Sequence, residues 1–481
     1  MKRVYLLTLV TLLFITGQSI AQDQPVQSPR TFTLQQCIDY ALENATLAKN
    51  VRLDEKIAES KVKETIGIGL PQISGSASMV HNEKLPRFFN TYTGPGGFID
   101  FSGVPGIEVG DVVAAENFFQ LKSSGDVGVS VNQLIFNGSY IVGLQASRTY
   151  KELSYKATDQ TNEVIVQGVT KAYYAVLINR ERIDLFTSNI ARVDTLLRNT
   201  RELFKNGFAE SIDADRIQVT LNNLIVERDK FLNINELGLA LLKFQMDYPA
   251  NEPIEISGNI KDVQKDINPE MFNENMDYKA RPDYQLLEVN KKLQELNVRN
   301  RRAAYLPTLG AFLNYGYSTQ SGNIGGLFKT NSAISDANGV GPDKWYNYSN
   351  YGLSLNIPLF TGLQSRNKVQ QEQITLQKIN NSFVYLKSSI DFEIKQASLT
   401  YDNALKSLIT QEENMALADK VARVTKIKYE QGIGSNIEVI DAEDALRQAQ
   451  TNYYSALYDV MIAKVDLEKS YGKLVPQIER N

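Results

Sequence analysis

Few side chains in this sequence have the type and spacing that catalysis requires. His81 is the only histidine and lies at the edge of an expected strand or loop. Asp213 and Asp215 are two residues apart, so on a helix they would point to different faces and form a poor acid–base pair. We find no Ser/His/Asp or Cys/His set, no metal-ligand spacing and no glycine-rich phosphate loop. The sequence therefore predicts a protein that is not an enzyme and that uses no cofactor or metal.

The first 21 residues predict export from the cytoplasm. Lys2 and Arg3 precede the apolar run Val4–Ile15, and Ser19 and Ala21 frame a small-x-small cleavage site. The apolar run is too short for a membrane-spanning helix. We expect residues 1–21 to be a signal peptide, and we expect no lipid anchor because the next residue is not a cysteine.

Charge and cysteine content exclude further classes of protein. Without Lys2 and Arg3, the 51 basic residues become 49 against 55 acidic ones, a net charge of −6 that argues against nucleic-acid binding. The lone Cys37 cannot form an intrachain disulfide, and we interpret it as a small apolar residue of the first helix.

Nothing after the signal peptide has the length of a membrane-spanning apolar helix. A membrane-inserted mature chain would therefore need the strands of a closed barrel.

The sequence repeats itself once, in the same order. The matching segments are Leu70–Met79 with Leu306–Tyr315, VSVNQLIFNG ending at Gly138 with LSLNIPLFTG ending at Gly362, and FKNGFAESIDA around Gly207 with YEQGIGSNIEV around Gly432. Repeats of this length indicate a duplicated domain rather than a stacked array. We expect a first repeat at 22–246, an inter-repeat segment at 247–281, a second repeat at 282–469 and a tail at 470–481.

Each repeat contains two segments in which apolar residues alternate with Ser, Gly and Asn. These segments are Gln72–Val80, Val127–Ile135, Leu309–Ser318 and Tyr351–Ile357. The alternation suits tilted transmembrane strands, although a sheet with one buried and one wet face gives the same pattern. The scarcity of charge on the polar side and the long loops 80–125 and 319–348 favour a barrel. Four strands cannot close one, so two copies would supply eight strands and three would supply twelve.

Two intervals without proline, Gly138–Gly207 and Gly362–Gly432, predict very long helices. Apolar residues three and four apart between Val169 and Phe204 indicate a coiled-coil-like face. At 1.5 Å per residue each helix would be ~100 Å long, a length that suits a structure crossing the periplasm. Shorter helices in a soluble bundle are the alternative, but no turn signal supports a break. Each interval ends at a glycine suited to a left-handed cap, and a second helix follows from about residues 212 and 437.

The ordered set of features resembles the TolC-type outer-membrane efflux proteins over essentially the whole mature chain. The resemblance rests on the duplication, the LP strand starts, the LF-x-G junctions and the segment YEQGIGSNIEVIDA. It implies a mixed α and β, mainly α protomer, three copies of which form a twelve-stranded β-barrel continued by an α-helical barrel. It also implies a mixed equatorial region, here residues 248–281 and 470–481.

The resemblance implies a passive exit duct in the outer membrane of a Gram-negative bacterium. Such a duct belongs to a tripartite efflux or type I secretion system and serves a periplasmic adaptor and, indirectly, an inner-membrane transporter of RND or ABC type. The positions that match the family's adaptor-docking tips are Gly207, Phe208, Ser211, Gly432, Ile433 and Ser435.

The resemblance also implies a periplasmic gate. Glu438 and Asp441 match two carboxylates that ring the family's narrow entrance, and three copies would give a cation-selective constriction. A solvated first helical turn, where acidic residues are favoured, is the alternative for this pair. Tyr429 and Asp213 match partners that hold the closed gate, whereas the arginine of that latch is replaced by Gly434.

Two other hypotheses remain open from the sequence. A periplasmic coiled-coil protein resembling an adaptor would explain the signal peptide and the long helices, but not four alternating strands. A closed barrel that transports nothing is the other alternative, and single-channel conductance would distinguish it. Trp345, close to Tyr346 and Tyr348, predicts an interfacial aromatic girdle rather than a ligand cage. The transported substrate cannot be read from the sequence, because the inner-membrane partner would select it.

Overall fold

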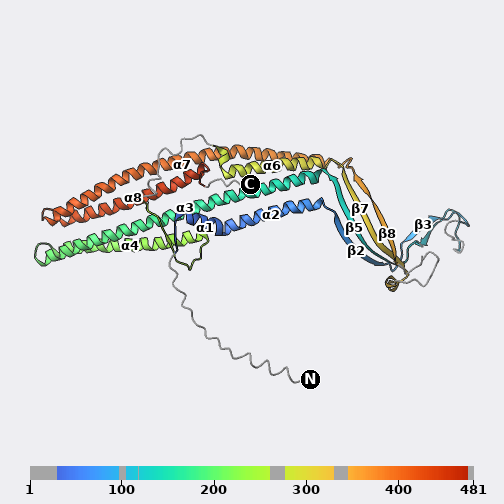
Figure 1. The fold of residues 1–481 in the computed structure, drawn as a ribbon, viewed down its shortest axis with the longest axis horizontal. Helices are drawn as coiled ribbons and strands as arrows, with labels where there is room; N and C mark the ends of the chain where they lie inside the picture. The colour runs from blue at the N-terminus through green and yellow to red at the C-terminus, as the bar shows by residue number, and fades with distance from the viewer. Residues whose placement is uncertain (1–29, 97–104, 118, 261–276, 330–344, 475–481) are drawn as a thin grey trace, which may run out of the picture. The chain divides into compact units, whose positions relative to one another are not determined.

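The computed structural model describes residues 30–96, 105–117, 119–260, 277–329 and 345–474 (Figure 1). The predicted signal peptide lies outside the described residues. The chain divides into two compact units, each built from separate stretches of sequence: unit 1 holds 1–52, 158–282 and 387–481, and unit 2 holds 53–157 and 283–386. Within the described residues, no helix combines the length and the apolarity needed to cross a bilayer.

Long helices dominate the described chain. They are α1 (Leu34–Asn44), α2 (Thr46–Ile68), α3 (Gly138–Lys205), α4 (Ser211–Met246), α6 (Pro282–Ala303), α7 (Gln364–Glu430) and α8 (Asn436–Ser470). The two predicted long helices are confirmed, since α3 has 68 residues and α7 has 67 without interruption. The returning helices α4 and α8 begin within one residue of the predicted positions.

Unit 2 contains a four-stranded antiparallel sheet in the order β2-β5-β7-β8 (Figure 1). Its strands are β2 (Gln72–His81), β5 (Ser123–Asn137), β7 (Thr308–Ser321) and β8 (Tyr346–Asn356). All four predicted strands are therefore confirmed. Both β5 and β8 start earlier than the sequence predicts, inside the expected loops 80–125 and 319–348, because pairing with β7 extends them.

The sheet has one apolar and one polar face, as the alternation predicted. The apolar face carries Ile73, Val127, Val129, Leu313, Tyr315, Tyr317, Tyr351, Leu353 and Leu355, all of them exposed. On the polar face, Ser74 and Ser130 share a hydrogen bond of 2.7 Å, and Asn314 donates one of 2.8 Å to Asn350. The edge strands are β2 and β8. Among the described residues, β2 pairs only with β5, and β8 pairs only with β7.

The long loops contain structure that the sequence analysis missed. Strands β3 (Arg87–Thr91) and β4 (Val112–Glu116) form a separate antiparallel pair, and η2 (Ile324–Phe328) is a short 3₁₀ helix after β7. Polar contacts tie the helices of unit 2 to each other. Lys151 of α3 forms an ion pair of 3.0 Å with Glu59 of α2, and Arg301 of α6 forms one of 3.2 Å with Glu372 of α7.

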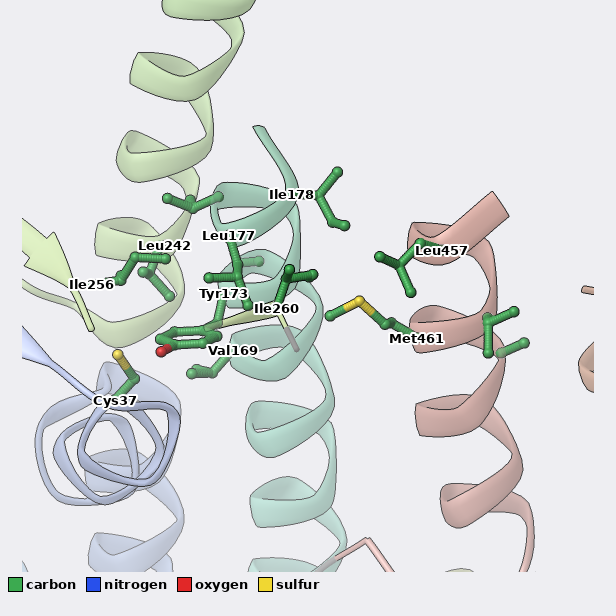
Figure 2. Close-up of a cluster of buried hydrophobic side chains, with 14 of the residues drawn as sticks. Cys37, Val169, Tyr173, Leu177, Ile178, Leu242, Ile256, Ile260, Leu457 and Met461 are labelled. Carbon is green, nitrogen blue, oxygen red and sulfur yellow. The ribbon is translucent and has the colours of Figure 1, made fainter. Parts of the chain in front are cut away.

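Unit 1 has its main apolar core where α1 meets the middle of α3, the C-terminal end of α4 and the second half of α8 (Figure 2). Cys37, Leu177 and Leu242 are completely buried in this core. Strand β1 (Arg30–Phe32) pairs in parallel with β6 (Ile254–Ile256) beside it, and η1 (Tyr278–Ala280) precedes α6. The burial of Cys37 confirms the interpretation of this residue as part of the first helix's apolar side.

Candidate functional site: the hairpin turns and the contacts between hairpins

The turns at the ends of the α3–α4 and α7–α8 hairpins have the same backbone geometry. Gly207 and Gly432 adopt φ angles of 83° and 76°, which favour glycine. The Phe208 and Ile433 amides donate to the carbonyls of Leu203 and Lys428, and the glycine amides donate to those of Phe204 and Tyr429. This pattern is the Schellman motif, so the predicted left-handed caps are confirmed. Phe208 and Ile433 remain 81% and 79% exposed, and each turn therefore presents one apolar side chain.

The helices that follow the turns begin differently. Ser435 caps α8, because its hydroxyl accepts a hydrogen bond of 3.3 Å from the Glu438 amide. At the turn between α3 and α4 the direction of the bond is reversed. There the earlier residue is the donor, since the Glu210 amide donates a hydrogen bond of 3.3 Å to the Asp213 carboxylate. Ser211 is the first residue of α4 rather than its cap. The two tip serines therefore occupy similar places in the sequence but different places in the structure.

Glu438 and Asp441 lie in the first two turns of α8 with their side chains exposed. Val439 and Ala442, next to them in sequence, are buried and pack toward the helical core. Residues three apart share a helix face, so the two carboxylates extend from the same exposed side of α8.

Tyr429 and Asp213 connect the two hairpins, but each through a partner that the sequence analysis missed. The Tyr429 hydroxyl lies 3.1 Å from the hydroxyl of Thr200 on α3. The Asn436 amide donates to the Asp213 backbone carbonyl at 2.9 Å and to its carboxylate at 3.1 Å. A Cβ added at Gly434 would lie 3.0 Å from the Tyr429 backbone nitrogen, so a larger residue there would displace the turn.

Further polar pairs join α3 to α8 along the hairpins. Arg192 donates to the Glu443 carboxylate at 2.7 Å and 3.1 Å, and the Glu443 side chain is only 7% exposed. The Asn189 amide donates to Gln450 at 2.8 Å in a buried position. Arg182 donates to the Ser455 hydroxyl at 2.7 Å. A sequence signal could have identified these polar pairs between α3 and α8. Their side chains interrupt a helix face that is otherwise apolar.

A polar cavity of about 320 Å³ lies farther along the same helices, within unit 1. Its lining includes Glu393, Thr400, Asp466 and Lys469. The Asp466 carboxylate accepts hydrogen bonds from Gln167 at 2.8 Å and pairs with Lys171 at 2.5 Å. These contacts hold α3 against α8 far from the turns, whereas at the tips Thr200 joins α3 to α7 and Asn436 joins α8 to α4.

Comparisons with known proteins agree with this geometry. The family described as outer membrane efflux protein matches residues 279–473. The outer membrane protein TolC of Vibrio cholerae is 22% identical over 73% of this chain and 77% of its own length. The probable efflux pump outer membrane protein TtgC of Pseudomonas putida is 23% identical over 73% of this chain and 69% of its own.

Solved structures show the same fold. The Campylobacter jejuni CmeC outer membrane channel has a TM-score of 0.65 at 16% identity, covering 93% of this chain and 87% of that one. VceC from Vibrio cholerae has a TM-score of 0.64 at 12% identity, covering 91% and 96%. Residues 279–473 thus match the outer membrane efflux protein family, and most of the chain is similar in sequence and in fold to TolC-type outer-membrane efflux proteins.

Proposed function

We propose that this protein is the outer-membrane exit duct of a tripartite efflux or type I secretion system of a Gram-negative bacterium. It conducts substrates passively from a periplasmic adaptor and an inner-membrane transporter to the outside. The observation that carries the proposal is the sheet of unit 2, which is apolar on one face, polar on the other and open at both edges. Such a sheet can face lipid and water at once, as the wall of a channel must.

The sheet also supports a homotrimer. Lipid does not tolerate the unpaired backbone groups of an open strand edge, so β2 and β8 need partners. Pairing β8 of one protomer with β2 of the next would complete the ladder, and three copies would give a twelve-stranded barrel. Within each protomer, helix, two sheet strands and a helical hairpin occur twice, which supports an internal duplication at 22–246 and 282–469.

The helices support the same assembly. Large apolar side chains remain exposed along α4 and α7, the two helices at the sides of the paired hairpins. They include Val226, Leu237 and Phe244 on α4 and Phe392, Leu417 and Val421 on α7. Packing α4 of one protomer against α7 of the next would bury both rows and continue the barrel as a helical tunnel.

The tips then have two functions in this proposal. Glu438 and Asp441 line the periplasmic entrance, where three copies place six carboxylates and favour cations. Tyr429 and Asp213, bonded to Thr200 and Asn436, hold the second hairpin against the first and so keep the entrance narrow. The adaptor docks on the capped turns through Gly207, Phe208, Ser211, Gly432, Ile433 and Ser435, where Phe208 and Ile433 offer the apolar contacts.

The periplasmic adaptor hypothesis accounts for less. It requires the long hairpins alone, whereas the chain devotes four strands of 10 to 15 residues to a two-faced sheet. The relatives named above are themselves outer-membrane proteins.

Three measurements test the proposal together. They are extraction from membranes, gel mobility with and without heating, and conductance in a planar bilayer. We expect a detergent-extracted, heat-dissociable trimer that opens ion-conducting pores. A water-soluble monomer without conductance would eliminate the channel, and a heat-dissociable trimer without conductance would indicate a closed barrel. Cross-linking at Phe208→Cys and Ile433→Cys, followed by identification of the captured protein, would then name the adaptor.

A further inference from the structure

One end of the sheet's apolar face is covered by the chain itself. Ser123, Thr319 and Ser321 belong to this face by register, since Ser123 pairs with Ser321 and Gly125 with Thr319. All three are buried, with exposures of 0%, 4% and 1%. Helix η2 packs against β5 and β7 at this end, with Leu327 only 2% exposed. The exposed apolar face therefore ends at Tyr317, and η2 covers the polar side chains beyond it.

Trp345 fastens this cover to the sheet. Its indole nitrogen donates a hydrogen bond of 2.9 Å to the Leu327 carbonyl in η2. The ring lies so close over Gly125 that a Cβ there would be 2.8 Å from it. We call Trp345 and η2 together the Trp345 clasp.

Tyr348 is close to Trp345 in sequence but lies over the other face. A Cβ added at Gly316 would meet its hydroxyl at 2.8 Å, and Gly128 lies under it as well. The Tyr348 hydroxyl donates to the Asp126 carboxylate at 3.3 Å. These glycines belong to the polar face, so only Trp345 of the two rings is on the apolar side. An aromatic girdle on the apolar face can therefore include Trp345 but not Tyr348, whose ring lies over the polar face.

The position of the clasp along the strands matches the edge of a membrane. From Leu309 to Tyr317 the apolar face of β7 spans eight residue steps, or ~27 Å along the strand. At a tilt of about 40° this spans roughly 20 Å of depth, close to the ~25 Å apolar band of outer-membrane barrels. Tyr315 and Tyr317, whose hydroxyls lie 3.2 Å apart, end the exposed apolar face next to the clasp. Tyrosine and tryptophan favour this depth because their rings are apolar and their tips polar.

On these grounds we infer that the Trp345 clasp is the outer-leaflet anchor of the barrel. Phe328 and Ile324, 67% and 53% exposed, contact lipid at the boundary between headgroups and acyl chains. The inference rests on the proposed function, because it requires the sheet to lie in the membrane. The occupant is lipid, since the clasp continues the lipid-facing surface on the same side of the sheet and hides the hydroxyl groups beyond it.

The chain supplies its own probe for this inference, because Trp345 is its only tryptophan. The purified full-length protein is reconstituted into phospholipid vesicles, and insertion is checked by conductance. Tryptophan emission is then quenched by lipids brominated close to the carbonyl or close to the methyl end, and by aqueous acrylamide. We expect quenching by the carbonyl-end lipids to be about twofold stronger than by the methyl-end lipids, with weak quenching by acrylamide.

Phe328→Ser with Ile324→Ser tests the contact independently of fluorescence. We expect this variant to assemble and conduct, yet to lose about half of the bromolipid quenching of Trp345 because the anchor sits higher. Phe89→Ser is the matched control, since this exposed phenyl group lies on the separate β3–β4 pair. Strong acrylamide quenching with no bromolipid effect in conducting protein would overturn the inference alone. Failure to insert or conduct would instead overturn the proposed function.

Discussion

At the scale of single residues, the contacts between hairpins are made by short-range pairs that can each be removed. Tyr429→Phe deletes only the hydroxyl that pairs with Thr200. A hydrogen bond of this kind contributes roughly 0.5–1.5 kcal/mol, so we expect the closed state to lose about two- to tenfold in population. Single-channel recordings of open probability measure this. Thr200→Val should have the same effect, and the double variant should add little to either, whereas additive effects would show that the pair does not act as a unit.

The exposed carboxylates of α8 give a second prediction at this scale. In the proposed trimer, Glu438→Gln with Asp441→Asn would remove six charges from the proposed entrance, so cation selectivity should fall while conductance remains. Reversal potentials in a salt gradient report the change. Asp444→Asn removes an acid of the same helix that is already paired with Arg447 at 3.4 Å, so this control should change the potential less. Equal potentials for the double variant and the wild type would place the two acids outside the conduction path.

Cys37 provides a pH-dependent prediction. Burial raises the pKa of its thiol to about 12. The unfolded thiol ionises near pH ~8.5, so above that pH the folded state holds a proton that the unfolded state has lost. Stability should therefore fall as the pH rises from about 8.5 to 12, and Cys37→Ala should lack this contribution. Chemical denaturation across that range tests it. The native thiol should also resist maleimide at pH 8, which leaves cysteines introduced at the tips as the reactive ones.

At the scale of elements, the turns that end the long helices depend on backbone conformation. Gly207→Ala or Gly432→Ala forces a side chain into the left-handed region at a cost of roughly 1–2 kcal/mol, so the tip should open and be cut more readily in limited proteolysis. Gly143→Ala is the control, because this glycine is inside α3 with open space around it. That change should be neutral or slightly stabilising. Equal cleavage of all three variants would contradict the role assigned to the turns.

The elements also show how far a sequence can be interpreted alone. Period-two alternation found the four strands, and gaps of three and four found the helices, because both patterns are local. The β3–β4 pair and the early start of β5 were missed because Phe88 meets Ala115, and Ser123 meets Ser321, only in the fold. The bonds from Thr200 to Tyr429 and from Asn436 to Asp213 join residues more than 220 positions apart, and no local pattern predicts such partners.

At the scale of the whole molecule, the two faces of the sheet should respond oppositely to charge. Leu353 lies on the apolar face and Ser354, its neighbour, on the polar face. An arginine that faces lipid at mid-depth costs roughly 2–4 kcal/mol per strand position, so Leu353→Arg should reduce the inserted trimer. Ser354→Arg should assemble normally and lower cation conductance. Heat-modifiable trimer in membrane fractions measures assembly, and the opposite ranking of the two variants would reverse the assignment of the faces.

The ladder between β5 and β7 has a consequence for how the protein reaches its final state. It is the longest ladder of the sheet, and it joins strands from the two halves of the sequence, pairing Val129 with Tyr315. During secretion the first half would leave the inner membrane with β5 unable to find this neighbour until some 180 further residues had followed. Such a separation makes pairing slow and prolongs the life of an unprotected strand edge. The chain should therefore depend on periplasmic chaperones until its second half has crossed, and a truncated first half should aggregate or be degraded rather than insert.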